Sequence, residues 1–241
     1  MSKMKVEIWS DVMCPFCYIG KRRFEKSLEN SVYKDKIEVE WKSFQLNPDM
    51  ITDPNMRIDE YLSIHKGIPL EQAKALNAQV TQMAAQEGLV YNFDKSITAN
   101  SFKAHVLTHF AKQFDKQDEI EELLFQSYFT EGKNIDDIEV LKEIATQVGV
   151  DAEKFEQVVQ EGSLDEEVKM DIHEARQLGV QGVPFFVYDR KYGISGAQPL
   201  EAFEQTLNKA IEEYSAQSGI QMQNKSNGGA CSIDGLSLIH I

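Results

Sequence analysis

The sequence is poor in cysteine and has no long apolar run, and each absence excludes one class of protein. Its 241 residues include 3 cysteines, too few for the multi-disulfide framework of a small secreted domain. No apolar stretch approaches the roughly 20 residues that a membrane-spanning helix requires. We therefore expect neither a disulfide-stapled scaffold nor a protein that has the membrane as a partner.

Basic residues are also scarce. The chain has 25 Lys and Arg against 39 Asp and Glu, which gives a formal net charge of −14. Nucleic acids and anionic membrane surfaces attract basic surfaces, so this balance argues against a nucleic-acid partner. The first residues, MSKMKVEIWSDV, lack the apolar core of a signal peptide, and we expect a cytoplasmic protein.

Two of the three cysteines lie close together, in SDVMCPFCYIGKRR. The strand-like run KVEIW precedes Cys14, and helical spacing of apolar residues follows it up to about Asn30. The N-terminus of a helix has unpaired N–H groups and a partial positive charge, so a thiolate there is stabilised and becomes a nucleophile. The spacing predicts that Cys14 faces outward and attacks a disulfide, whereas Cys17, one turn further in, resolves the mixed disulfide.

Two other interpretations of this pair remain open. The two cysteines could be ordinary buried thiols. A zinc site would need two more ligands, and Cys231 with His240 is the pair that could supply them, in a segment that we expect to be a flexible tail. A close pair between a strand and a helix in a βαβ context favours redox chemistry over both, with no metal.

The pattern of apolar residues predicts strands at both ends of a helical region. KVEIWS and KIEVEWKSFQL alternate apolar and polar side chains, with a helix between them. A long helical region follows, then VPFFVYDR and GISGA as a hairpin turning at KYG, and a last helix. The order β-α-β, helices, β-β-α predicts an α/β protein with a four-stranded mixed sheet and a large all-helical insertion. We assign residues 1–56 and 180–215 to the sheet domain, 57–179 to the inserted helical domain and 216–241 to a flexible tail.

A proline opens the second strand region, in GVQGVPFFVY. Taken alone, Pro184 would be a trans proline that starts a strand. In a thioredoxin-type sheet, a proline at this place is cis and packs beside the dithiol. Together with the dithiol and the hairpin that follows, Pro184 is predicted to be cis, which leaves the Val183 backbone open to an incoming peptide.

Four motifs follow one another along the chain: SDVMCPFCYIGKRRFE, TANSFKAHVLTHFA, LFQSYFTEGKNIDDIEVL and ARQLGVQGVPFFVYDRKYGISGAQP. With them the chain resembles, over about residues 4 to 212, the DsbA family of thiol–disulfide oxidoreductases, in its FrnE-like subgroup. The resemblance implies a thioredoxin-like fold with a helical insertion, Cys14 as the attacking thiol, Cys17 as the resolving thiol and Pro184 as the cis proline.

The resemblance also implies substrates and partners. Protein or small-molecule thiols and disulfides would meet the chain at Pro15, Phe16, Val183 and Pro184. A reductant such as thioredoxin or glutathione would recycle the dithiol, and glutathione is a candidate co-substrate. Beyond the redox-active pair no cofactor is implied. Periplasmic DsbA oxidants resemble CPHC, and because Phe16 cannot donate the hydrogen bond of that histidine, we expect a less oxidising pair.

The resemblance singles out Cys231 and His105, and two aromatic residues are assigned to the core. FrnE-like proteins can carry a second cysteine pair near the C-terminus, but Leu236 stands where a partner for Cys231 would be, so we expect Cys231 to be a lone thiol. His105, in NSFKAHVLTHF, either approaches the active-site face or is a helix histidine satisfied by a neighbour. Trp41 and Phe44 are predicted to belong to the core.

Two competing functions stay beside disulfide exchange. One is a glutathione-dependent isomerase or transferase of the 2-hydroxychromene-2-carboxylate isomerase or kappa type. Those proteins share the topology but resemble a serine, not a cysteine, at the position of Cys14, and they give Cys17 no role. The other is a non-catalytic binding module that uses an apolar groove around Phe16, Val183 and Phe185.

Overall fold

The computed structural model describes residues 3–217 and 239–240. The strands are β1 Met4–Ser10, β2 Ile37–Ser43, β3 Asp53–Arg57, β4 Ile97–Thr98, β5 Phe185–Tyr188, β6 Tyr192–Ser195 and β7 Ile239–His240. The helices are α1 Pro15–Asn30, α2 Ile58–Lys66, α3 Leu70–Gln86, α4 Phe102–Lys112, α5 Gln117–Phe125, α6 Ile138–Gln147, α7 Ala152–Glu161, α8 Asp165–Gln177 and α9 Leu200–Gln217. A short 3-10 turn, Lys34–Lys36, precedes β2, and a π-helical segment, Gln126–Glu131, continues α5.

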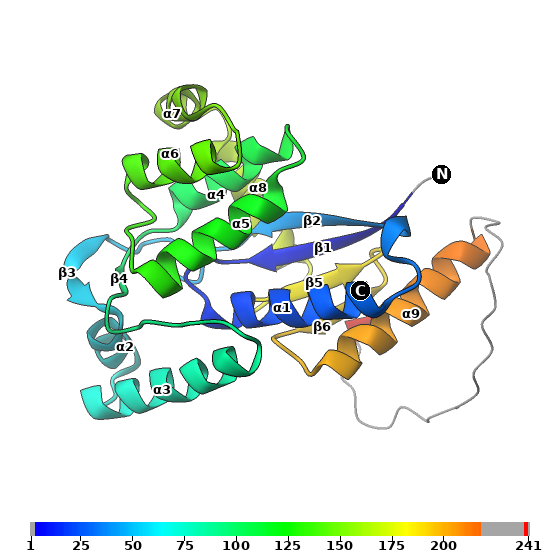
Figure 1. Cartoon of the computed structure of the whole chain (residues 1–241), viewed down its shortest axis with the longest axis horizontal. Coiled ribbons are helices and arrows are strands. Elements are labelled where there is room, and N and C mark those ends of the chain that lie inside the picture. The colour runs from blue at the N-terminus through cyan, green and yellow to red at the C-terminus, as the bar shows by residue number, and fades with distance from the viewer. Residues whose placement is uncertain (1–2, 218–238, 241) are drawn as a thin grey trace.

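The main sheet has the strand order β2-β1-β5-β6-β7 (Figure 1). β1 runs parallel to β2 and antiparallel to β5, and β5 and β6 form an antiparallel hairpin. The predicted mixed four-stranded sheet is therefore confirmed. The two residues of β7 add a short strand beside β6, and most of the tail predicted for 216–241, with Cys231, lies outside the described residues.

Helices α1 and α9 lie together over one face of the sheet (Figure 1). Phe24 of α1 packs against Phe186 of β5 and Phe203 of α9, with ring centroids 5.5 and 6.3 Å away. The opposite face is covered in part by α8, where Ala175 packs with Trp9 and its neighbours. Trp41 and Phe44 are buried, as the sequence predicts. The sheet thus lies between helices on both faces, as a mixed sheet with crossovers requires.

Helices α3 to α8, the helical part of the fold, contribute to one buried cluster that also includes Cys14 and Cys17. The dithiol therefore lies where the sheet part meets the helical part. A second, two-stranded sheet of β3 and β4 was not predicted. Its strand β3 crosses the expected domain boundary after residue 56, and its DPNMR sequence has no alternating apolar pattern by which it could be found.

The hairpin turn differs from the prediction. The sequence suggested a turn at KYG, but Gly193 lies inside β6, opposite Val187. The turn is made instead by Asp189 and Arg190, with φ of 49° and 54°. With Lys191 they form the loop between the paired residues Tyr188 and Tyr192, and positive φ at such turn residues matches the right-handed twist of the strands. Asp and Arg adopt it here without a glycine.

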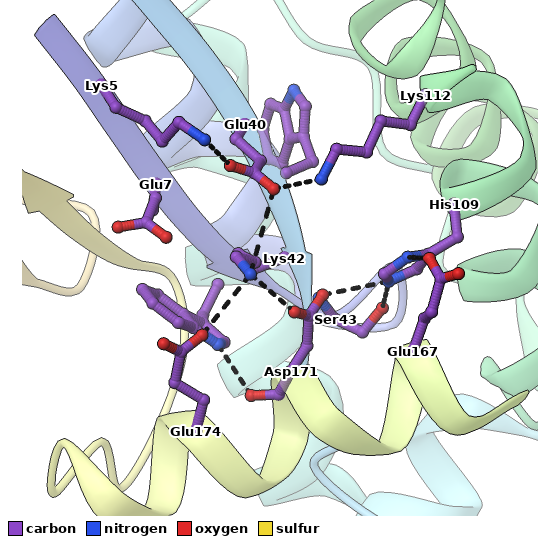
Figure 2. Close-up of polar contacts among 12 residues, drawn as sticks. Lys5, Glu7, Glu40, Lys42, Ser43, His109, Lys112, Glu167, Asp171 and Glu174 are labelled. Atoms are coloured by element: carbon purple, nitrogen blue, oxygen red, sulfur yellow. Dashed lines mark hydrogen bonds and ion pairs between the residues drawn. The ribbon is translucent and has the colours of Figure 1, made fainter. Parts of the chain in front are cut away.

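A buried polar network fastens helices α4 and α8 to the outer strand β2 (Figure 2). The Asp171 carboxylate accepts hydrogen bonds from Lys42 Nζ at 2.8 Å and from the Ser43 N–H at 3.0 Å. His109 Nε2 lies 3.0 Å from the same carboxylate and 3.1 Å from Ser43 Oγ. Because a buried carboxylate is costly unless it is paired and hydrogen-bonded, these contacts fix how the helices sit on the sheet. Across residues 3–217, no helix is long and apolar enough to cross a bilayer.

Candidate active site

The dithiol lies at the junction of β1 and α1, as predicted. Cys14 is the N-cap of α1, with φ −87° and ψ 112°, and Pro15 takes the first helical position, which suits its missing N–H and fixed φ. The Cys14 N–H donates to the Asp11 carbonyl at 2.9 Å, and the Cys17 N–H donates to the Cys14 carbonyl at 3.0 Å. The backbone thus holds both cysteines in one tight turn.

Both thiols are free, and both are buried. Cys14 is 4% exposed and Cys17 1% exposed, whereas Phe16 between them is 38% exposed. The order of exposure agrees with the predicted roles, but the expectation that Cys14 faces outward is wrong. Its Sγ donates to the Val183 carbonyl at 3.4 Å, so the loop before β5 covers the sulfur.

The covering loop is the one that contains the predicted cis proline. The Val183–Pro184 peptide bond is cis, as the sequence predicts. The Pro184 carbonyl accepts the Gly196 N–H at 2.8 Å, which ties the loop to the end of β6. On α1, a Cβ at Gly20 would come within 2.9 Å of Pro184 Cγ. The loop can approach the helix this closely because residue 20 has no side chain.

The two thiols differ in their surroundings. Burial and the neighbouring Cys14 raise the pKa of Cys17 well above its usual value, and the Asp11 backbone N–H and the Ser10 hydroxyl oppose this rise only in part. Cys17 is therefore held as a thiol. Cys14, by contrast, is the N-cap of α1.

Two residues that the sequence analysis missed hold this turn in place. Asp11 is 1% exposed; its Oδ1 accepts the Met13 N–H at 3.2 Å and its Oδ2 accepts the Leu46 N–H at 2.8 Å. Tyr91, from the loop after α3, donates its hydroxyl to the Pro15 carbonyl at 2.7 Å. Asp11 could have been found as a short polar residue just before a helix. Nothing in the local sequence marks Tyr91, 76 positions from Pro15.

His105 lies behind the dithiol loop, on the second turn of α4. It is 1% exposed, and its Nε2 is 3.7 Å from Asp11 Oδ1. It thus has a neighbouring carboxylate, and its role as an accessory residue of the site stays a prediction. Among the described residues no group of three or more His, Cys, Asp or Glu side chains could hold a metal. Cys231, which the zinc alternative needs, lies outside them.

Comparison with known proteins agrees with this geometry. The family model of the DSBA-like thioredoxin domain matches residues 5–208. A probable DsbA oxidoreductase from Streptomyces coelicolor has a similar structure, with 38% identity, a TM-score of 0.82 and coverage of 96% of this chain and 97% of that one.

More distant structures share the fold alone. A 2-hydroxychromene-2-carboxylate isomerase is 18% identical with a TM-score of 0.63, over 89% of this chain and 99% of that one. The cytosolic disulfide reductase DsbM from Pseudomonas aeruginosa, solved with GSH, is 15% identical with a TM-score of 0.62, over 86% and 99%. The match to the family model over most of the sequence is decisive, and the chain belongs to the family of DsbA-like thioredoxin-domain proteins.

Proposed function

We propose that the chain is a thiol–disulfide oxidoreductase that exchanges disulfides through Cys14 and Cys17. The observation that carries the proposal is the free dithiol at the N-terminus of α1, with Cys14 Sγ 3.4 Å from the Val183 carbonyl. A helix N-terminus stabilises the attacking thiolate, and a second thiol one turn inside can complete the exchange. Membership of the family supports the same chemistry.

The reaction proceeds in two exchanges. The Cys14 thiolate attacks one sulfur of a substrate disulfide, a bond forms between them, and the other substrate sulfur leaves as a thiolate that takes up a proton. Cys17 then loses its proton and attacks Cys14 Sγ. The mixed disulfide breaks, the second substrate thiol is released, and a Cys14–Cys17 disulfide remains. Two electrons pass from the dithiol to the substrate, and the reverse sequence oxidises a substrate dithiol.

Substrate contact is assigned to the residues that surround Cys14. Phe16 is the exposed apolar side chain beside it. Val183 presents its carbonyl at the sulfur, so an extended peptide can replace this contact with main-chain hydrogen bonds of its own. Pro15 and Pro184 border the same place. We assign protein or small-molecule disulfides as substrates.

The same chemistry indicates how the dithiol is reduced again and in which cellular compartment the protein works. In the forward direction the pair ends oxidised, so a thiol reductant such as glutathione or thioredoxin has to restore it. A cytoplasmic setting supplies such reductants. The FrnE-like subgroup and the weaker oxidising power expected from Phe16 stay predictions.

The isomerase alternative has less support. Its relative among the solved structures shares the fold at 18% identity, which does not carry an activity. In that reaction Cys17 has no task, although the structure buries it one turn from Cys14. The non-catalytic binding module explains neither thiol. Disulfide exchange is the one function of the three that uses both.

The test is reduction of insulin by dithiothreitol or glutathione with catalytic amounts of the protein, followed by turbidity. We expect the wild-type chain to accelerate precipitation and a Cys14→Ser variant to be inactive, because the attacking sulfur is gone. Refolding of a scrambled disulfide protein gives a second readout for isomerase activity. Equal rates for the wild type, the Cys14→Ser variant and the uncatalysed reaction would show that the proposed function is wrong.

A further inference from the structure

Helix α4 carries two buried histidines one turn apart, and each is paired with a buried carboxylate. His105 Nε2 lies 3.7 Å from Asp11 Oδ1, and His109 Nε2 lies 3.0 Å from Asp171 Oδ2. In both pairs the carboxylate also accepts backbone N–H groups of another segment. The segments differ: Asp171 binds the outer strand β2, as Figure 2 shows, whereas Asp11 binds the loop of the dithiol.

Asp11 accepts three backbone N–H groups, two from the dithiol loop and one from the segment after β2. Its backbone carbonyl accepts the Cys14 N–H at 2.9 Å. Its carboxylate accepts the N–H groups of Met13 and Leu46. A buried carboxylate needs a compensating charge, and without one its own negative charge opposes a thiolate nearby. A side chain that supplies such a charge therefore helps to hold the carboxylate and, through it, the backbone of the dithiol loop.

His105 is in the right place to supply it. At 3.7 Å its contact with Asp11 is an ion pair rather than a hydrogen bond, and within the described residues Nε2 has no hydrogen-bond partner. Burial lowers the pKa of His105, but the charge of Asp11, with Glu121 and the Phe44 carbonyl, outweighs burial and raises it. The protonated imidazolium is therefore favoured.

Glu121 of α5 is the other acidic side chain that faces His105. Thr108 Oγ1 donates to Glu121 Oε1 at 2.8 Å, and Oε2 has no partner among the described residues. Burial raises the pKa of Glu121, although the charge of His105 opposes this. Asp11, 3.7 Å from Nε2, is the carboxylate that pairs with His105 in this cluster.

We propose that His105 is a positioning residue for the dithiol, which holds the Asp11 carboxylate and offsets its charge beside Cys14. The proposal rests on the exchange function proposed above. Through Asp11, His105 links the helical part of the fold to the turn that carries the attacking sulfur. Without its positive charge, the Asp11 carboxylate is uncompensated, a smaller fraction of Cys14 is thiolate at neutral pH, and the reduced form of the pair is less stable.

The test compares two histidines on one helix. His105→Gln removes the charge behind the dithiol. His109→Gln is the matched control, since it removes a buried histidine that is paired to a carboxylate away from the dithiol. The measurement is the rate of alkylation of Cys14 by iodoacetamide against pH, followed by mass spectrometry. For His105→Gln we expect a rate near pH 6 lower by roughly three- to tenfold, equivalent to about half to one pH unit, and convergence with the wild type at high pH. His109→Gln should keep the wild-type profile.

A double variant separates charge from general damage. In Asp11→Asn/His105→Gln both charges of the pair are absent, so the alkylation rate near pH 6 should return most of the way to that of the wild type. If the single variant were slow because of structural damage, the second substitution would instead lower the alkylation rate further. A His105→Gln profile that overlaps the wild type, an equal shift in His109→Gln, or no recovery in the double variant would each overturn the proposal.

A measurement on the wild-type chain keeps the proposal testable if His105→Gln does not fold. Because coupling between two sites is reciprocal, the titration midpoint of the His105 imidazole, followed by NMR, should be higher in the reduced protein than in the oxidised one. Equal midpoints would overturn the proposal. Neither the alkylation profile nor this titration requires turnover, so an inactive wild-type chain in the insulin assay counts against the proposed function and not against the role of His105.

Discussion

Cys14 Sγ donates a hydrogen bond to the Val183 carbonyl oxygen over 3.4 Å, although 169 positions separate the two residues in the chain. The contact joins the start of α1 to the loop that leads into β5. In the reduced protein the attacking sulfur is therefore covered by the same backbone that we assign to substrate contact. An arriving disulfide has to displace this contact, which couples access to Cys14 with binding of the substrate at Val183.

Alkylation should distinguish the two thiols. Iodoacetamide at mildly acidic pH should modify Cys14 first, because Cys17 is 1% exposed and its pKa is raised by burial, and the thiolate is the species that reacts. Peptide mapping by mass spectrometry gives the order. In denaturant the two should react at similar rates. Earlier labelling of Cys17 in the folded protein would reverse the assigned roles.

Removal of the resolving thiol should trap the first intermediate. In Cys17→Ala, Cys14 can still attack a disulfide, but no second thiol attacks the product, so mixed disulfides with substrate should accumulate. Non-reducing electrophoresis after incubation with oxidised glutathione or a disulfide protein detects them. The control is Cys14→Ser/Cys17→Ala, which should form none. A reduced, folded Cys17→Ala chain that forms no adduct would count against thiol exchange.

The close approach of α1 to the Pro184 loop can be tested at Gly20. In Gly20→Ala the new Cβ would lie 2.9 Å from Pro184 Cγ and 3.3 Å from Phe186 Cζ, so the loop or the helix has to shift. Overpacking of this kind costs about 1–3 kcal/mol, against a gain of about 1 kcal/mol from replacing a helical glycine. We expect a lower Tm or slower exchange.

Gly182→Ala is the control for this substitution, because a Cβ at Gly182 meets nothing within 4 Å. It should leave the Tm unchanged or raise it slightly, since alanine restricts the unfolded chain. If Gly20→Ala were as stable and as active as Gly182→Ala, the close packing of the loop on α1 would be wrong.

The network of Figure 2 predicts a pH-dependent contribution to stability. Burial raises the pKa of Asp171. Hydrogen bonds from His109, Lys42 and the Ser43 backbone have the opposite and larger effect, so the pKa lies below its usual 3.8. A lowered pKa in the folded state means that the contribution is complete above about pH 4 and is lost as pH falls through the folded value. Asp171→Asn should therefore cost about 3–5 kcal/mol at neutral pH, and the difference from the wild type should shrink in acid.

Urea unfolding at several pH values measures this difference. Glu166→Gln is the matched control on the same helix, because its side chain is 80% exposed and pairs with Lys169 at the surface, where ion pairs contribute little. It should unfold as the wild type does. An Asp171→Asn deficit that persisted unchanged to pH 2 would show that the carboxylate charge is not its cause.

The sequence by itself determined the features that depend on local pattern. Alternation of apolar residues located the strands of the main sheet, and the position of the dithiol between β1 and α1 followed from its neighbours. A proline that opens a strand, taken with that dithiol, predicted the cis bond at Pro184. The signals for the strands and for the dithiol lie within one turn or one strand of the residues concerned, which is why a single sequence carries them. The cis bond needed in addition the distant dithiol.

Only the tertiary structure decided how exposed Cys14 is and what lies behind it. Its burial comes from Val183, and the cluster of Asp11 and His105 joins the end of β1 to a helix about ninety residues away. The β3–β4 sheet and the contact of Tyr91 with the dithiol turn also join residues that are far apart in the sequence. Such contacts form because distant segments bury their apolar faces in one core, and no local pattern records which polar groups then meet.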